Sequence, residues 1–370
     1  MQFSTARGER GDVRARLGEL LPMANWMYDP DELLAEWGFA DVGVILSRHA
    51  NGLEALALLS RRERHGELIR LADGVRVRAS VFAALTDARR VLLRIIATAL
   101  TWTVGGVVSH ESAAAVHELA LLRSNTGVVH TIVPVASGGR STGKVRRHAI
   151  LLHADEIDTV RGLRVTTLAR TVADLAAHLP HAAAVAAADS AMSSHRNRPL
   201  ERHELLAQVS RRRDNNTRRG VARIEAVAQF ADGRAESPKE SESRVVIAEL
   251  GFAAPELQYE VFDADGLAGR TDFAWPSERT LGEYDGKTKY FDEQLTGGLS
   301  PEQILWKEKR REERLRAAGF RVVRWDAADL ATPARLAAKL RRAGVPRACP
   351  ASATHTGERY KRFARGRHRE

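Results

Sequence analysis

The chain has 370 residues, of which 44% are hydrophobic and 28% are charged, and its net charge is +10. This length and apolar content predict two or three folded domains and argue against a largely disordered chain. A single cysteine, Cys349, excludes an internal disulfide framework and a cysteine zinc site, as expected for a cytoplasmic protein. The charged N-terminus has no apolar core of signal-peptide type. The most apolar window, residues 91–110, is too interrupted to span a membrane, so we expect no membrane partner.

The excess of basic residues makes nucleic acid the first partner to test. The alternative is an arginine-rich composition that implies no partner.

Residues 1–85 are expected to form a winged-helix-like DNA-binding region. A helix is predicted over 52–66, with an apolar stripe that includes Leu53 and Leu56 and with Arg61 and Arg62 at its far end. Asp73-Gly74 between apolar runs predicts a hairpin after this helix. A helix followed by a basic hairpin would place the helix against DNA. The alternative is a small helical domain whose arginines are simply solvated.

Residues 86–230 are expected to form a mixed α/β domain. Strands are predicted over 127–135 and 146–152, and helices over 109–122, 166–179 and 182–192. The stretch GGRSTGKV resembles a phosphate loop but has Val145 where a hydroxyl should bind magnesium, so we interpret it as a hairpin loop. His110 and His117 are two helical turns apart, which is too far for one metal ion.

Residues 231–346 are expected to form a third domain, followed by a disordered basic tail over 347–370. Its pattern predicts the order helix, three strands, helix, strand and a last helix, over the ranges 238–250, 257–263, 269–275, 280–285, 301–318, 320–325 and 327–342.

Three acids fall on one hairpin of this domain. If Trp275 lies opposite Thr280, Asp272 lies opposite Glu283, and alternation places Asp285 on the same face as Glu283. Carboxylates gathered in this way would repel one another unless a cation held them, and Mg²⁺ or Mn²⁺ with oxygen ligands would do so. The alternative is a surface hairpin whose acids pair with Arg270, Lys287 and Lys289.

The order of elements and these acids resemble the PD-(D/E)XK endonuclease superfamily, and in particular its Vsr-like branch. Asp272 in RTDFAWP matches the metal-binding aspartate, and Glu283 in GEYDG matches the acid of the (D/E)XK motif. Glu240 matches the helical glutamate, although Ser237 and Glu240 are also spaced as a helix cap. Asp285 stands where the catalytic lysine would fall.

The resemblance implies a metal held by Asp272, Glu283 and Asp285. The wider catalytic set adds Glu240 and Lys289, with Lys287 as the alternative lysine. The basic helix over 301–318 carries Lys309 and Arg310, which would contact phosphates beside the metal, unless this face is only a surface laced with salt bridges.

Residues 40–195 resemble the AbiEi-type antitoxins of type IV toxin–antitoxin systems. The resemblance lies in VVSHESAAAVHEL and in GLRVTTLARTVADL. It implies promoter binding, autoregulation and a cognate toxin as a partner.

The sequence therefore predicts a multi-domain α/β protein of the cytoplasm that binds DNA. Its C-terminal domain would be a metal-dependent endonuclease that hydrolyses DNA phosphodiesters. The alternatives are a non-catalytic, antitoxin-like transcriptional regulator and a plain interaction protein.

Overall fold

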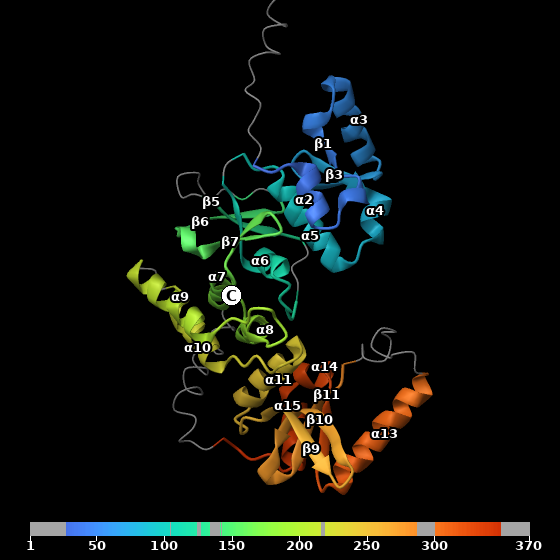
Figure 1. Cartoon of the computed structure of the whole chain (residues 1–370), viewed down its shortest axis with the longest axis vertical. Coiled ribbons are helices and arrows are strands. Elements are labelled where there is room, and N and C mark those ends of the chain that lie inside the picture. The colour runs from blue at the N-terminus through green and yellow to red at the C-terminus, as the bar shows by residue number, and fades with distance from the viewer. Residues whose placement is uncertain are drawn as a thin grey trace, which may run out of the picture. The chain divides into compact units, whose positions relative to one another are not determined.

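A computed structural model describes residues 27–103, 105–123, 127–133, 141, 143–215, 219–286 and 300–348. Helices and three sheets alternate along this part of the chain, which confirms the mixed α/β class (Figure 1). The chain divides into two compact units, Met1–Ser112 with Thr126–Val165 and Ala113–Asn125 with Thr166–Glu370. The domain boundaries predicted at residues 85, 230 and 346 stay a prediction. No helix in the described ranges has both the length and the apolar character needed to cross a bilayer.

The first unit begins with short helices around a small antiparallel sheet of order β1-β3-β2. Its elements are α2 (Pro30–Glu36), β1 (Ile45–Leu46), α3 (Gly52–Arg64), β2 (Leu68–Ala72), β3 (Val75–Arg78), α4 (Ala79–Ala84) and α5 (Asp87–Ala99). The hairpin predicted at Asp73-Gly74 is confirmed, and Gly74 adopts the positive φ of 70° that a tight turn requires.

Helix α3 corrects one prediction. It has no buried residue, and Leu53 and Leu58 of this helix are 84% and 53% exposed. The leucine spacing predicted a buried stripe, but spacing reports only which residues share a face and not whether another element covers that face.

A five-stranded sheet of order β6-β5-β4-β8-β7 completes the first unit. Its strands are β4 (Val107–Val108), β5 (Val129–Val133), β6 (Val145–Ala149), β7 (Ile157–Val160) and β8 (Leu163–Thr166). The predicted strands over 127–135 and 146–152 are confirmed, whereas β7 and β8 were not predicted. Half of the phosphate-loop-like stretch lies outside the described residues. The interpretation of this stretch as a hairpin loop was wrong, because β5 and β6, which it joins, pair in parallel.

Helix α6 (His110–Val116) is shorter than the predicted helix, which was expected to reach residue 122. Glu118, two residues beyond its end, has a positive φ of 56°. This left-handed backbone stops the helix.

The second unit opens with a helical layer. It consists of α7 (Leu168–His178), α8 (His181–Met192), α9 (Arg202–Asp214) and α10 (Val221–Phe230), which share a core of alanine, valine and leucine side chains. Arg170 and Asp174, one turn apart on α7, form an ion pair at 3.0 Å. Helices α9 and α10 were not predicted.

The C-terminal part of the second unit is a four-stranded sheet of order β12-β11-β10-β9, in which β11 and β12 form the parallel pair. The elements in chain order are α11 (Pro238–Glu249), β9 (Glu256–Asp263), β10 (Gly266–Trp275), β11 (Thr280–Tyr284), α13 (Pro301–Ala317), β12 (Arg321–Trp325), α14 (Ala327–Ala331) and α15 (Pro333–Arg342). The predicted order is therefore confirmed. The helix expected over 327–342 is broken in two, because Pro333 has no N–H to continue it.

Separate apolar clusters cover the two faces of this sheet. Phe273 and Trp325 belong to one cluster, together with residues of α11 and α15. Ala274 and Leu281 belong to the other, together with Leu315 of α13. Gly282 allows close packing between the layers, because a Cβ atom there would lie 2.6 Å from the Trp325 ring.

A buried ion pair joins the helical layer to this sheet module. Asp189 of α8 is 1% exposed and accepts a hydrogen bond of 2.7 Å from the Arg244 guanidinium of α11. Its other oxygen accepts from the backbone N–H of Asp232 at 2.7 Å. Burial raises the pKa of Asp189 to about 6, against the opposing effect of Arg244.

We expect Asp189→Ala to lower the free energy of unfolding by about 3 kcal/mol, because it leaves the Arg244 guanidinium buried without its carboxylate. Denaturant unfolding of the full chain measures the change. Arg234→Ala is the matched control, since the Arg234–Asp232 pair is exposed on its arginine side, and it should cost less than about 1 kcal/mol. Equal losses in the two variants would contradict this role of the buried pair.

Candidate functional site

The register of the acidic hairpin is the predicted one. Trp275 pairs with Thr280, and Phe273 pairs with Gly282. Beyond this pair, the Asp272 carboxylate accepts a hydrogen bond of 2.8 Å from the backbone N–H of Tyr284. Asp272 and Glu283 therefore lie on neighbouring strands, β10 and β11, at the end of the hairpin that is remote from its turn.

Glu283 is held by two arginines from outside the hairpin. Arg311 of α13 donates to its Oε1 at 2.6 Å, and Arg324 of β12 lies 2.9 Å from its Oε2. Glu308 of α13 contacts both guanidiniums. Burial raises the pKa of Glu283, while the two arginines oppose that rise. Glu312 also lies 3.3 Å from Arg324 and pairs with Arg316, so three carboxylates and three guanidiniums form one network over the sheet.

Glu240 has the capping role that its spacing suggested. Ser237 caps α11 by accepting from the backbone N–H of Glu240 at 3.2 Å, and Glu240 accepts from the Ser237 hydroxyl at 2.8 Å. Its other oxygen accepts from the backbone N–H of Glu236 and from Gln258. Burial raises the pKa of Glu240, and the negative charge of Asp272 raises it further.

Asp285 and Arg270 do not form the cross-strand pair that was predicted. Arg270 instead lies 2.9 Å from Glu236, and its strand partner is Glu260 of β9. Asp285 follows the last residue of β11, is exposed, and donates its backbone N–H to Trp325. The pairing of β10 with β11 ends at Phe273 and Gly282, so it does not reach Arg270 and Asp285. Lys287 and Lys289 lie outside the described residues.

These acids do not gather around one point. Within the described ranges, no three of Asp272, Glu283, Asp285 and Glu240 bring ligand oxygens within 4.8 Å of one another. Glu283 in addition has arginine nitrogens at the positions where a cation would bind. The arrangement thus does not fit a magnesium ion held by Asp272, Glu283 and Asp285.

A basic groove runs beside this network. It has a volume of about 860 Å³ and is lined mainly by side chains of α13, among them Trp306, Lys307, Arg310, Arg311 and Arg314. The Arg310 guanidinium lies 5.0 Å from the centre of the Trp306 ring, and that tryptophan is 62% exposed. Arg314 is paired with Asp263, whereas Lys307 and Arg310 form no ion pair among the residues that the structure describes. Lys309 is exposed on the same helix but does not line the groove.

The predicted arginines of the first unit lie at the end of α3. Arg61 is exposed, and Arg62 pairs with Glu67 at 2.8 Å. The pairing of Arg62 reduces the positive charge that this end of the helix can offer to a phosphate.

Sequence reasoning missed the two arginines on Glu283 and a group of three histidines in the five-stranded sheet. The arginines lie 28 and 41 residues from Glu283 along the chain, and His110 was considered only with His117. The histidines at 110, 130 and 148 belong to three different predicted elements, so only a correct strand order could have brought them together.

Comparison with known proteins finds two similar proteins of Mycobacterium tuberculosis. The chain is 32% identical over 219 residues to "Uncharacterized protein Rv2248" of Mycobacterium tuberculosis strain H37Rv. The same identity holds for "Uncharacterized protein MT2308" of strain CDC 1551. The match covers 59% of this chain and 74% of each relative. No protein-family model matches the chain.

The network on Glu283 predicts a loss of stability in acid. Hydrogen bonds from Arg311, stronger than the opposing effect of burial, lower the pKa of Glu308 to about 2. A folded-state pKa below that of an unfolded glutamate, 4.5, contributes stability above that pH, and the contribution is lost as the pH falls towards 2. Glu308→Gln should therefore be less stable than the wild type at neutral pH, by about 2 kcal/mol, and the difference should shrink between these two pH values.

Denaturant midpoints at several pH values measure this difference. Glu313→Gln is the control, because this exposed glutamate of the same helix forms no ion pair within the described ranges. A difference between wild type and Glu308→Gln that did not change with pH would contradict the interpretation.

Proposed function

The chain belongs to the same family as these two mycobacterial proteins, and we propose that it is a DNA-binding protein whose C-terminal module holds the phosphate backbone in the groove along α13. The observation that carries the proposal is the pair Lys307 and Arg310. Both line the groove, which Glu302 also lines, and neither forms an ion pair among the described residues. Cations of this kind attract phosphates in any sequence of DNA.

The exposed Trp306 ring adds a second mode of contact. An aromatic face beside an arginine can stack on an unpaired base or pack on a sugar, in addition to the phosphate contact. A single wide groove with aromatic and basic side chains suits a nucleic-acid strand better than it suits a small apolar ligand. The net charge of +10 supports the same class of partner.

The architecture of the module supports a relation to PD-(D/E)XK endonucleases. Its elements follow the order α11, β9, β10, β11, α13, β12, as the resemblance requires, and Asp272 and Glu283 sit on adjacent strands. The two arginines on Glu283 favour binding over hydrolysis, because they satisfy the carboxylate that a metal would need. We therefore propose a non-catalytic, antitoxin-like regulator as the primary function.

Hydrolysis with Mg²⁺ or Mn²⁺ is the second candidate. It is favoured by Asp272 near the buried Glu240, since burial and the charge of Asp272 raise the pKa of Glu240, and an acid perturbed in this way is typical of functional sites.

The first unit supports the regulatory proposal. Helix α3 precedes the β2–β3 hairpin, and the order β1-β3-β2 places the strand before the helix beside the last strand, as in a winged helix. The uncovered leucines of α3 and the exposed Arg61 would then lie on the surface that meets DNA or a toxin.

We expect the double variant Lys307→Ala/Arg310→Ala to bind duplex DNA about tenfold more weakly than the wild type and to lower the salt dependence by about two phosphate contacts. Fluorescence anisotropy with a labelled duplex over a series of salt concentrations measures both. Arg316→Ala is the matched control, because Arg316 is a paired arginine of the same helix that does not line the groove. Equal salt slopes for the wild type and the double variant would contradict the proposal.

Incubation with supercoiled plasmid separates the two candidates. We expect binding that persists in EDTA and no nicking with Mg²⁺ or Mn²⁺, because Arg311 and Arg324 occupy the Glu283 carboxylate. Metal-dependent nicks that disappear in both Asp272→Ala and Glu283→Ala, but not in the surface control Glu260→Ala, would establish hydrolysis instead. Nicks that persist in all three variants would indicate a contaminating nuclease.

A further inference from the structure

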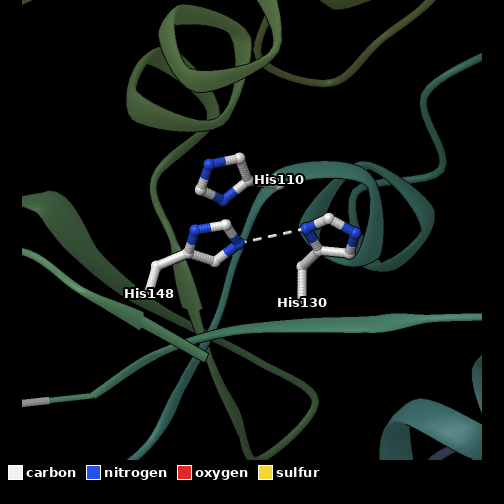
Figure 2. A group of neighbouring side chains, drawn as sticks. All are labelled: His110, His130 and His148. Atoms are coloured by element: carbon white, nitrogen blue, oxygen red, sulfur yellow. Dashed lines mark hydrogen bonds between the residues drawn. The ribbon is translucent and has the colours of Figure 1, made fainter. Parts of the chain in front are cut away.

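Three histidines, two from neighbouring strands of the five-stranded sheet and one from the start of α6, lie close together. His110 is the first residue of α6, directly after β4, and His130 and His148 lie on β5 and β6. The sheet order β6-β5-β4 makes these strands neighbours. His148 pairs with Ile132, two residues from His130, so the two side chains share a face of the sheet. Figure 2 shows the three rings converging.

One distance within this histidine cluster matches that between two ligands of one metal ion, and the third ring lies close enough to join them. His130 Nδ1 and His148 Nε2 are 3.2 Å apart, and the rings of His110 and His148 are stacked with centroids 4.0 Å apart. One ligand atom from each of the three residues lies within 4.8 Å of the others. Bonds of about 2.0–2.1 Å in a tetrahedral zinc site separate neighbouring nitrogens by roughly 3.3 Å.

The carboxylate of Glu111 lies beside the cluster, outside the set of three ligand atoms that are all within 4.8 Å of one another. Glu111 Oε2 lies 3.6 Å from His130 Nδ1, is buried, and has no hydrogen-bond partner within the described ranges. A buried carboxylate oxygen without a partner is costly, and a cation at this point would satisfy it. A hydrogen bond between neutral His130 and His148 would give each ring a partner, but it would leave Glu111 Oε2 without one.

The surrounding groups hold the cluster in place. Ser109 Oγ lies 3.0 Å from His110 Nδ1, and the Ser112 hydroxyl accepts from the backbone N–H of His130 at 2.9 Å. His110 has a positive φ of 52°, a conformation that side-chain-bearing residues rarely adopt. Such backbone strain is found where a side chain must be held in a particular direction, and here it accompanies the convergence of the three rings.

We propose that His110, His130 and His148, with Glu111 as the fourth donor, form a binding site for a divalent transition metal of the zinc class. Imidazole nitrogens suit Zn²⁺, Co²⁺ or Ni²⁺ and not Mg²⁺, so this site is distinct from the one considered in the C-terminal module. Four protein donors make a closed, structural site that would tie β4, β5 and β6 together and stabilise the first unit.

Titration of the metal-stripped full chain with Co²⁺ tests this site directly, because four-coordinate Co²⁺ absorbs visible light strongly. We expect one Co²⁺ per chain, displacement by Zn²⁺ but not by excess Mg²⁺, and a higher thermal unfolding midpoint with Zn²⁺ bound. Binding should weaken in acid, since protons compete for the imidazoles. Failure of the wild type to bind Co²⁺ stoichiometrically would overturn the proposal.

Variants locate the bound ion. His148→Gln removes a ligand from a half-buried position and should weaken binding by at least about 100-fold, and Glu111→Gln should weaken it by more than about tenfold and alter the absorption bands. His195→Gln is the control, because this histidine is 78% exposed and belongs to the second unit, and it should bind like the wild type. Unchanged binding in His148→Gln would exclude this cluster. If circular dichroism shows that His148→Gln does not fold, the spectrum of Glu111→Gln decides, and unaltered bands there would refute the proposed fourth donor.

Discussion

The contact of Glu283 with Arg311 and Arg324 organises the C-terminal module. It places a buried carboxylate of the central strand β11 between a helix and the neighbouring parallel strand. Because an unpaired charge in such a position would be strongly destabilising, α13 must keep the face that carries Arg311 towards the sheet. The orientation of α13 then follows, and with it the direction in which Trp306, Lys307 and Arg310 face the groove.

The same contact favours phosphate binding by this module over metal-dependent catalysis. A carboxylate shared by two guanidiniums and supported by Glu308 forms a balanced network, so it offers little net negative charge to a metal ion. Lys307 and Arg310, which form no ion pair among the described residues, lie within about one turn of Arg311 on α13. The module thus combines the strand order of an endonuclease with an electrostatic arrangement suited to holding phosphate. The charge of Asp272 raises the pKa of Glu240, and the candidate hydrolytic function depends on these two acids.

Metal chemistry was expected in the oxygen-rich hairpin, whereas the geometry favours a nitrogen-rich site in the other unit. The difference arises from how each set of ligands is assembled. The acids of the hairpin lie close in sequence, but α13 and β12 bring arginines to Glu283. The histidines lie far apart in sequence, and the sheet brings them together with Glu111. The two sites would bind different ions, so metal binding at one site can be tested without removing the other.

Local patterns in the sequence determined a large part of this protein. Alternation and turn residues predicted the β10–β11 register to the residue, and Ser237 with Glu240 predicted the cap of α11. These features depend on neighbours within a few positions, which the sequence shows directly. Only the tertiary structure decided that Arg311 and Arg324 reach Glu283, that the leucines of α3 stay exposed, and that three histidines meet. Each of these features depends on which helices and strands pack together. That packing is decided by the burial of whole apolar faces from segments far apart in the sequence, which no local pattern records.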